Sequence, residues 1–506
     1  MPVSSQPMTL FRFLQPPFPR AASVLVACGL ALAAPASHPQ TINLPRLGDA
    51  GADELSPAVE RRLGDQIMRS LRRDVAVSDD VEIADYLNRL AGRLTSTASA
   101  NGFTFELFLV RDDTLNAFAL PGGYIGVHSG LIVAAQNESE LASVLAHEIG
   151  HVTQRHIARM LSQQRQSSTA ILAGMVLAAL AARSNPQAAM GMITMAAGAQ
   201  QQQMLSFSRD AEREADRVGI ETLRQADFDP GGMVGFFGRL QQASRVYESS
   251  APAYMRSHPV TVERIADMQS RVQEGRYRQR ADSVEFRLVR ARLPVLADAT
   301  VDGLRTVRSR FERSLRDRTT VDELAAWFGI AAAAAAQRDF AGAEQAIAEC
   351  RQRLPASHPF IERLAADAKL RAGDPAGALA IAQAASARFV GARALDHLQA
   401  EAMIAMRDFR KAAAFLEDQL SLYRGDASLW RLLSQARYGL GEPAQAHRAA
   451  AEEYALIGGW MAAIEQLRLA QKSRDLDFYT ASRIDARIKE LQAEYTREQQ
   501  DKAGQR

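Results

Sequence analysis

Cysteine and net charge are both scarce in this sequence of 506 residues. Only two cysteines occur, Cys28 and Cys350. If Cys28 belongs to a cleaved leader, the mature chain keeps one thiol and no internal disulfide, which fits a reducing or an oxidising compartment. The 60 Lys and Arg residues are nearly balanced by 58 Asp and Glu residues, so the composition gives no argument for nucleic-acid binding. The length exceeds that of a single hydrophobic core and predicts two or more domains.

Apolar runs long enough to span a membrane are lacking as well. The run at 169–182 has 14 residues and ends at Arg183, and a second apolar stretch covers 188–198. A membrane-spanning helix needs about 20 apolar residues. We interpret 169–198 as buried helix; the alternatives are a hydrophobic flap that touches membrane or substrate, and a membrane-embedded protease in which this segment spans lipid.

The N-terminus carries an export signal. Arg12 and Arg20 precede an apolar run at 21–36 that ends in Ala-Pro-Ala. A basic stretch, a short apolar stretch and a small-x-small site are typical of a secretory signal peptide, predicted here at 1–36. Two alternatives are an N-terminal membrane anchor and lipidation of Cys28, which follows Leu-Val-Ala. An extended arm is predicted at 37–55.

The residues from 56 to 275 predict a mostly helical α+β domain with a small β-sheet. Apolar positions recur at helical spacing from 56 to 98. Aromatic and branched residues predict a strand at 103–110, and 115–133 is interpreted as two short strands about the turn Pro-Gly-Gly. Further helices are expected over two ranges, 138–162 and 204–225.

The C-terminal part repeats itself with a period of about 34 residues, after a helical linker predicted at 276–320. Equivalent turn segments carry an acidic residue at Asp339, Asp374, Asp408 and Glu442. Such a period, with small residues between two helices, is typical of tetratricopeptide repeats. We therefore predict an α-solenoid of these repeats at 321–475 and a capping helix at 476–506; the alternative is an Ala-rich bundle without regular stacking.

The motif that carries chemistry is the HExxH string from His147 to His151. Positions i and i+4 share one face of a helix, so the two imidazoles can bind one metal ion. Glu148 then points at the open coordination position, where its carboxylate can accept a proton from water. Two ligands do not hold a catalytic zinc, and a third ligand is required.

Candidates for the third ligand lie in the segment SRDAEREADRVG at 208–219. Glu212 and Asp216 are spaced i and i+4, so one carboxylate can bind the metal while the other fixes a ligand imidazole. The segment is rich in charge, and the alternative interpretation is a solvated helix face.

At this point the sequence resembles the M48 family of gluzincin metallopeptidases. HExxH followed by ExEADRxG carries the resemblance, together with LNAFALPGG at 115–123, and it covers about 56–268. It implies that Glu212 is the third zinc ligand and that Asp216 supports the site or donates a proton. The implied cofactor is one Zn²⁺ per chain, and the implied activity is peptide-bond hydrolysis with Glu148 as general base.

The order of signal peptide, M48 domain and repeats is similar to that of a periplasmic subgroup in Gram-negative bacteria. This resemblance implies degradation of outer-membrane proteins that fail to assemble and promotion of their correct assembly. The repeats would bind a client or the barrel-assembly machinery, with peripheral outer-membrane association as an open question. His258 in RSHP matches a loop histidine that caps the zinc in the subgroup; otherwise it is a surface histidine. The rival hypothesis is a periplasmic chaperone or adaptor with a latent protease.

One further candidate feature is the strand at Asn116, Ala117 and Phe118. An extended substrate can pair with an exposed strand edge there, with its scissile bond beside the zinc; the alternative is an ordinary internal strand. The remaining histidines without a partner at ligand spacing are interpreted as structural, namely His128, His156, His358 and His397.

Overall fold

The computed structural model describes residues 56–74, 76–96, 102–163, 208–246, 253–274, 280–319 and 322–503. The chain divides into two compact units, Met1–Leu47 and Gly48–Arg506, and every described residue belongs to the second. Four features from the sequence lie outside the described residues: the signal peptide at 1–36, the arm at 37–55, Cys28 and the apolar segment at 169–198.

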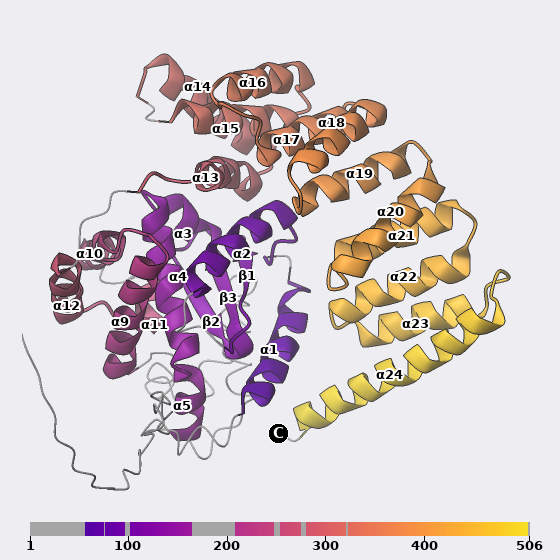
Figure 1. The fold of residues 1–506 in the computed structure, drawn as a ribbon, viewed down its shortest axis with the longest axis horizontal. Coiled ribbons are helices and arrows are strands. Elements are labelled where there is room, and N and C mark those ends of the chain that lie inside the picture. The colour runs from indigo at the N-terminus through magenta and orange to yellow at the C-terminus, as the bar shows by residue number, and fades with distance from the viewer. Residues whose placement is uncertain are drawn as a thin grey trace, which may run out of the picture. The chain divides into compact units, whose positions relative to one another are not determined.

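A three-stranded sheet lies at the centre of the N-terminal region (Figure 1). Its strands are β1 (Glu106–Val110), β2 (Ala117–Leu120) and β3 (Tyr124–His128), in the order β1-β3-β2. The first pair is parallel and the second antiparallel, so β2 is an edge strand of this sheet. The turn η3 (Pro121–Gly123) joins β2 to β3 through two glycines with positive φ, which β-carbon sterics disfavour for other residues.

The predicted strand reaching Val133 is too long. It ends at His128, and the next residues form the short helix α3 (Ser129–Ala134). Ser129 Oγ donates to Asp112 O at 2.9 Å, and Gly130 N donates to the same oxygen at 2.8 Å, which fixes the start of the helix. A short apolar run does not distinguish strand from buried helix by its pattern alone.

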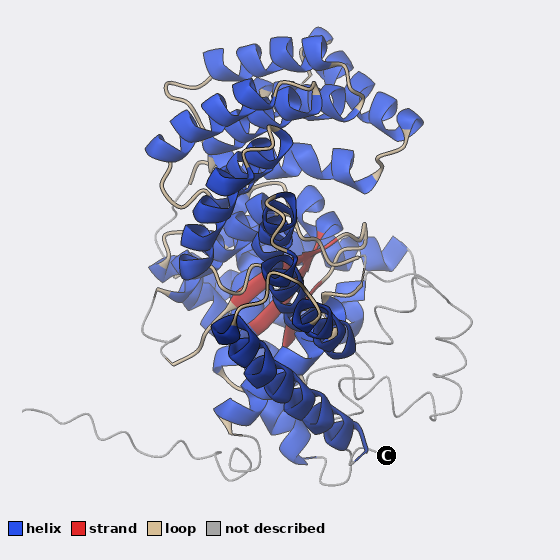
Figure 2. Ribbon diagram, turned by 90° about the vertical axis from the view of Figure 1, so that its right-hand side faces the viewer, coloured by secondary structure: helices blue, strands red, loops and turns tan. Residues whose placement is uncertain are grey.

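Helices surround the sheet, as Figures 1 and 2 show. They are α1 (Pro57–Leu71), α2 (Val81–Thr95), α4 (Glu138–Thr153), α5 (His156–Gln163), α9 (Arg209–Gln225), α10 (Gly231–Val246), α11 (Ala253–Ser257) and α12 (Val262–Gln273). The single helix predicted at 138–162 is therefore two. Arg155 between them adopts φ 54°, and its guanidinium donates to Glu60 at 2.7 Å, which holds the break. None of the described helices is long and apolar enough to cross a membrane.

Small residues allow α4 and α9 to pack closely. A β-carbon on Gly150 of α4 would lie 3.1 Å from the backbone of Ala215 on α9. Gly219 of α9 meets α4 one turn away, where its β-carbon would lie 3.3 Å from the amide nitrogen of His147. The close approach therefore brings the HExxH turn of α4 directly against α9.

The predicted linker region contributes to the main hydrophobic core. Its helices are α13 (Val284–Ala297) and α14 (Val301–Arg316). Phe286 and Leu293 of α13 are buried in the same cluster as Ile83 of α2 and Phe328 of α15 (Glu323–Ala336). The core therefore runs from the sheet region through α13 into the first C-terminal helices without interruption.

The C-terminal helices follow one another as pairs (Figure 1). The first helices of the pairs are α15 (Glu323–Ala336), α17 (Pro359–Arg371), α19 (Arg393–Ala405) and α21 (Ala427–Gly439). Their partners are α16 (Phe340–Gln352), α18 (Pro375–Arg388), α20 (Phe409–Leu422) and α22 (Pro443–Leu456), starting 35, 34 and 34 residues apart. Two more helices end the region, α23 (Trp460–Gln471) and α24 (Phe478–Ala503).

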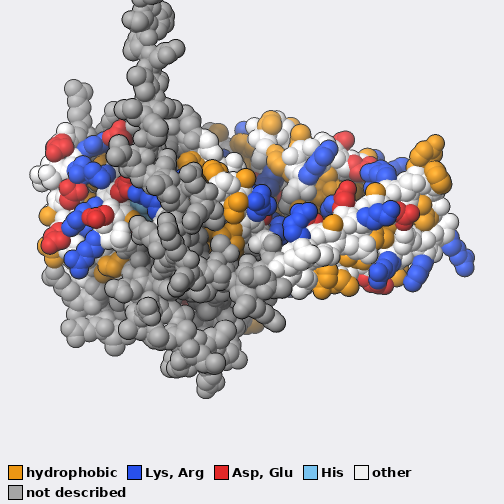
Figure 3. Space-filling model, turned by 90° about the horizontal axis from the view of Figure 1, so that it is seen from below, with side chains coloured by type: hydrophobic (Ala, Val, Ile, Leu, Met, Phe, Trp, Pro, Cys, Tyr) orange, Lys and Arg blue, Asp and Glu red, His pale blue; other side chains and the backbone are white. Residues whose placement is uncertain are grey.

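The acidic residues that define the sequence period stand at the N-termini of these partner helices. Asp339 accepts a hydrogen bond from Gly342 N at 3.0 Å, and Asp374 accepts one from Gly377 N at 2.8 Å. An Asp at this position satisfies backbone N–H groups that the helix leaves free. The result is an α+β domain followed by a helical repeat region, as the sequence predicts. On the face in Figure 3, acidic and basic side chains of the described residues lie interspersed.

Candidate metal centre

Two imidazoles of α4 and one carboxylate of α9 meet in the interior. The Nε2 atoms of His147 and His151 are 3.0 Å apart. Glu212 Oε2 lies 3.4 Å from the first of these atoms, and Glu212 Oε1 lies 3.3 Å from the second. All three side chains are almost fully buried, with at most 2% of each exposed. Glu212, which lies 61 or more positions after either histidine in the chain, thus presents its carboxylate to the same point as the two imidazoles.

His258 completes this cluster from the loop that follows α11. Its Nδ1 lies 2.9 Å from Glu212 Oε1 and 3.4 Å from His147 Nε2. Its other ring nitrogen, Nε2, lies 3.5 Å from Glu148 Oε1. The ring stacks on Tyr254 with centroids 4.6 Å apart, which fixes its plane. One imidazole therefore stands between the three donors of the other residues and the Glu148 carboxylate.

The four donor residues fit a divalent cation such as zinc. One ligand atom from each of His147, His151, Glu212 and His258 lies within 4.8 Å of all the others. Tetrahedral zinc with bonds of about 2.0–2.1 Å requires donors roughly 3.3–3.4 Å apart, close to the observed separations. Both Glu148 oxygens are buried without a well-formed hydrogen bond among the described residues. A buried carboxylate in this condition is costly and marks a position for a proton or a polar partner.

Asp216 supports this cluster from behind. Its Oδ1 lies 3.0 Å from His147 Nδ1, the ring nitrogen that faces away from the donor cluster. Arg264 of α12 donates from Nε to Asp216 Oδ2 at 2.7 Å and from Nη2 to Oδ1 at 2.8 Å, while its Nη1 lies 2.7 Å from Glu212 Oε2. Burial alone would raise the pKa of Asp216, but the hydrogen bonds from Arg264 and His147 hold that pKa below its ordinary value. Asp216 is thus an ionised, immobilised acceptor.

His156 occupies the equivalent position behind His151, and the sequence did not reveal it. Its Nδ1 lies 2.8 Å from His151 Nδ1, and its Nε2 lies 3.1 Å from Glu214 Oε2. With Nε2 of His156 donating to Glu214, its Nδ1 accepts the proton of His151, which frees His151 Nε2 for a metal. On a continuous helix, residues five positions apart point about 140° away from each other, so only the break at Arg155 allows this contact.

The electrostatics of the cluster follow from burial and from these partners. Burial raises the pKa of Glu148 and lowers that of His151 far below its ordinary value. Burial also lowers the pKa of His147, but hydrogen bonds with Asp216 and Glu212 outweigh it and raise that pKa to about 9. Glu212 is held ionised, because the charge of His258 and hydrogen bonds from the imidazoles lower its pKa despite burial. A metal that binds here displaces the proton from His147.

The predicted substrate strand packs against the helix that carries the HExxH motif. Ala117 and Phe118 belong to the edge strand β2, which packs against α4. Asn116 precedes the strand, and its carbonyl oxygen accepts a hydrogen bond from His128 N at 3.0 Å. The Phe118 ring lies over Gly126, where a β-carbon would approach to 2.4 Å. Among the described strands, β2 is thus an edge strand of the sheet, and its pairing with β3 on one side fixes its position.

The other histidines serve local structure. His128 Nδ1 lies 2.9 Å from Thr114 Oγ1, and His397 Nε2 lies 3.0 Å from Asp426 Oδ2. His358 accepts from Phe360 N at 3.3 Å and so caps α17. Of the histidines interpreted as structural, His156 is the one whose ring contacts a candidate metal ligand.

Comparison with known proteins agrees with this geometry. The sequence profile of peptidase family M48 matches residues 79–272. The beta-barrel assembly-enhancing protease of Escherichia coli strain K12 is 32% identical over 475 residues, which cover 93% of this chain and 95% of that protein. The chain belongs to peptidase family M48.

Other relatives agree with the M48 assignment. The beta-barrel assembly-enhancing protease of Yersinia pestis is 32% identical over 448 residues, 88% of this chain and 91% of that protein. The mitochondrial metalloendopeptidase OMA1 of Schizosaccharomyces pombe is 30% identical over 194 residues, 38% of this chain and 54% of that protein. This M48 protein is therefore a metallopeptidase whose similarity to the bacterial relatives extends through the helical repeat region.

Proposed function

We propose that this protein is an exported zinc metalloendopeptidase that cleaves unfolded or misassembled outer-membrane proteins in the periplasm of a Gram-negative bacterium. One observation carries the catalytic part, namely the convergence of four buried donor residues beside the Glu148 carboxylate. The biological setting is supported by the signal-peptide pattern and by the similarity to the bacterial beta-barrel assembly-enhancing proteases.

His147, His151 and Glu212 are the proposed zinc ligands. Bound zinc would polarise the peptide carbonyl and make water a better nucleophile at neutral pH. Glu148 accepts the proton of the attacking water and passes it to the leaving amine, a task that suits a buried carboxylate with a raised pKa. Asp216 orients His147 through Nδ1, and its engagement by Arg264 favours this orienting role over proton donation.

His258 is proposed to hold the enzyme in a latent state. Its Nδ1, beside Glu212 and His147, would act as a fourth ligand to a bound zinc, at the position that a catalytic zinc must leave open for water. Its Nε2 simultaneously faces the general base at 3.5 Å. Hydrolysis therefore requires the loop that follows α11 to move His258 away from both groups.

The edge strand β2 is the proposed docking position for substrate. An extended peptide can add to the edge of β2 that pairs with no other described strand, and β2 packs against the helix that carries HExxH. Main-chain pairing reads an extended conformation more than a sequence, which suits unfolded clients. The helical repeat region, proposed to consist of tetratricopeptide repeats, would bind the client or the barrel-assembly machinery.

A Glu148→Gln variant tests the catalytic assignment. We expect cleavage of an unfolded outer-membrane protein to fall at least a hundredfold while the zinc content stays at one per chain, because the base is lost and the ligands are retained. Glu221→Gln on the exposed face of α9 is the matched control. Retained cleavage in Glu148→Gln would refute the role of this carboxylate.

The same Glu148→Gln variant separates protease from adaptor. If it fails to restore barrel assembly in a deletion strain, proteolysis is the required activity. If it restores assembly fully, the repeat-based chaperone or adaptor role is the main function and the protease is a latent addition.

A His258→Ala variant tests whether this histidine holds the enzyme in the latent state. We expect cleavage to rise severalfold with zinc retained, because the fourth position becomes available to water. His447→Ala in the repeat region, where the side chain is hydrogen-bonded to Gln466, controls for general loss of a histidine. Lower or unchanged activity of a folded, zinc-loaded His258→Ala protein would rule out this inhibitory role of His258.

A further inference from the structure

A second recessed site lies in the repeat region, between α20 and α24. It encloses about 1040 Å³. Its apolar wall includes the buried side chains of Leu433, Leu467 and Ile484, and the half-buried ring of Trp430. The Trp430 ring is fixed because its Nε1 donates to Arg424 O at 2.9 Å. The volume is that of sites which bind a small molecule or a short stretch of peptide.

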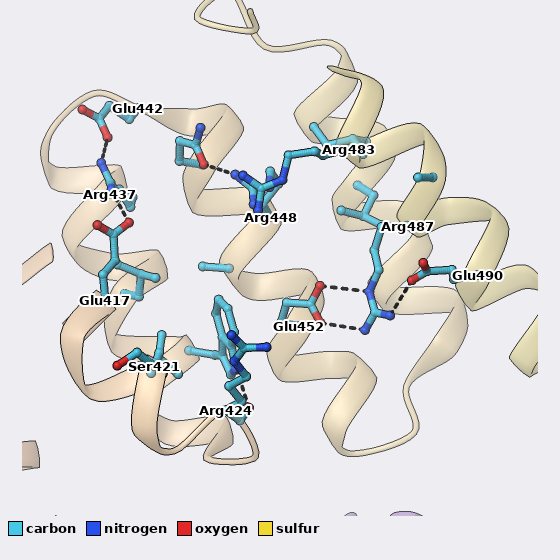
Figure 4. Close-up of a pocket in the computed structure, with 18 of the residues that line it drawn as sticks. Glu417, Ser421, Arg424, Arg437, Glu442, Arg448, Glu452, Arg483, Arg487 and Glu490 are labelled. Carbon is cyan, nitrogen blue, oxygen red and sulfur yellow. Dashed lines mark hydrogen bonds and ion pairs between the residues drawn. The ribbon is translucent and has the colours of Figure 1, made fainter. Parts of the chain in front are cut away.

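Most of the carboxylates in this groove are already paired (Figure 4). Arg437 forms ion pairs with Glu417 and Glu442 at one side. Arg487 at the other side forms ion pairs with Glu452 at 2.7 Å and with Glu490 at 2.9 Å. Each of these two arginines thus forms ion pairs with two glutamates, which leaves the four carboxylates little capacity to bind a further cation.

Two further arginines converge between these pairs without an acid between them. Figure 4 shows the side chains of Arg448 and Arg483 pointing toward each other. Arg448 Nη1 donates to the neutral side chain of Gln445. Arg483 has neither a hydrogen bond nor an ion pair from its side chain among the described residues. Burial lowers the pKa of Arg448, and the charge of Arg483 lowers it further against the opposing effect of Glu452.

We propose that this groove binds a peptide segment of a partner protein through one carboxylate, which Arg448 and Arg483 hold jointly. Planar guanidinium groups match the two oxygens of a carboxylate and form charge-assisted hydrogen bonds with it. The neighbouring apolar wall accepts the side chain next to that carboxylate. The carboxylate is either a Glu or Asp side chain or the C-terminus of the peptide.

The charge balance of the groove favours a single carboxylate over a polyanion. Five arginines line it, and they are matched by four glutamates and Asp475. A neutral lining gives no long-range attraction for a phosphate-rich surface or a nucleic acid. The paired arginines instead offer a local site for one negative charge. This inference rests on the proposed role of the repeats in binding proteins, and it does not depend on zinc or on catalysis.

The test measures binding of designed peptides to the full chain carrying Glu148→Gln, which prevents cleavage of the probe. The probes are octapeptides of Gly, Ser and Leu that carry an uncharged BODIPY dye at the N-terminus. One carries an internal Glu with an amidated C-terminus, one carries Gln with a free C-terminus, and one carries Gln with an amidated C-terminus. The first two distinguish a side-chain carboxylate from a terminal one, and fluorescence anisotropy gives the Kd of each.

The variant Arg448→Gln/Arg483→Gln should weaken binding of the acidic peptides tenfold or more. The matched control, Arg410→Gln/Arg474→Gln, removes the same charge from exposed positions outside the groove and should change Kd less than twofold. The neutral peptide should bind at least tenfold more weakly than the better acidic peptide. Circular dichroism confirms that both variants remain folded.

Three results would overturn the proposal. The first is equal affinity for the acidic and the neutral peptides. Failure of every probe to bind at concentrations up to about 1 mM counts as the same result. The second is unchanged affinity in the Arg448→Gln/Arg483→Gln variant. The third is binding of phosphatidylglycerol vesicles that this variant loses, which would assign the groove to lipid headgroups. Because the probe protein is catalytically inactive, each outcome is separate from failure of the proposed protease function.

Discussion

The metal centre and the groove of the repeat region use the same kinds of side chain in opposite ways. At the metal centre, Arg264, Glu212 and Asp216 are at most 3% exposed, and the arginine forms an ion pair with each of the two carboxylates. In the groove, Arg487 and its two glutamates are 28–63% exposed, so water screens each pair. Burial makes the first set rigid enough to aim ligands at one ion. Exposure leaves the second set adaptable, which suits recognition of a partner.

The largest effect is expected when one arginine is removed from each of the two regions. Arg264→Ala should lower the free energy of unfolding by about 3–5 kcal/mol, because two buried carboxylates lose their partner. Arg487→Ala, which also contacts two carboxylates, should cost no more than about 1 kcal/mol because the pairs are exposed. Urea denaturation of metal-free protein measures both. Equal losses would show that burial does not separate the two regions.

The next test addresses the partner of His151. His156→Ala should weaken zinc binding by about 10–100-fold, because His151 loses the group that orients its ring. Competition with a chromophoric chelator gives the affinity. His397→Ala removes a histidine that is bonded to Asp426 in the repeat region and should leave zinc affinity unchanged. An unaltered affinity in His156→Ala would make that residue a packing element only.

The close packing of the two metal-binding helices gives a smaller effect. Gly150→Ala places a β-carbon 3.1 Å from the Ala215 backbone, and we expect a loss of about 1–2 kcal/mol in unfolding free energy. Gly92→Ala in α2 meets nothing within 4 Å and should stabilise the protein by about 0.5–1 kcal/mol through helix propensity. If both variants are stabilised, close helix contact is not what positions the ligands.

The smallest effect is expected at the partly exposed pair of His358 and Glu285. The nearby imidazole of His358, whose Nε2 lies 3.7 Å from Glu285 Oε1, lowers the pKa of Glu285 to about 2. Since this pKa lies below that of the unfolded chain, the pair stabilises the fold above the unfolded pKa, and the gain disappears as pH falls toward 2. The separation of 3.7 Å and the partial exposure limit the gain to about 1 kcal/mol.

Glu285→Gln checks that pair by chemical denaturation as a function of pH. It should reduce stability at pH 6 and have progressively less effect below pH 4, as the wild-type carboxylate takes up a proton. Glu263→Gln, at a side chain that is 74% exposed, is the control with little expected effect. A loss that grows as pH falls would contradict the assigned sign.

The sequence predicts those parts of the site that follow helix periodicity or a known motif. His147 and His151 share a helix face, and the resemblance to M48 peptidases pointed to Glu212 and His258, all of which meet in the structure. The sequence did not predict His156, because its contact with His151 depends on the single residue Arg155 adopting a positive φ. Arg264 was also missed, since a lone arginine on an amphipathic helix gives no sign of burial.

In the fold, too, the sequence predicted the features that follow a regular pattern and failed where long-range contacts decide the structure. The 34-residue period defined the repeat helices, because each acidic residue stands at the N-terminus of a helix and caps it in at least two cases. The strand predicted through Val133 was wrong, since hydrogen bonds from Ser129 and Gly130 to a distant carbonyl start a helix there. Long-range contacts of this kind leave no local pattern in the sequence.

Zinc stoichiometry tests the central claim most directly, namely that α4 and α9 together hold one cation. Mass spectrometry of the folded protein, reconstituted with zinc and dialysed, should find one ion per wild-type chain. Glu212→Gln should lose that ion, whereas Asp210→Asn, on the exposed side of the same helix, should keep it. A wild-type protein without zinc, or a Glu212→Gln protein that retains it as tightly, would contradict the account.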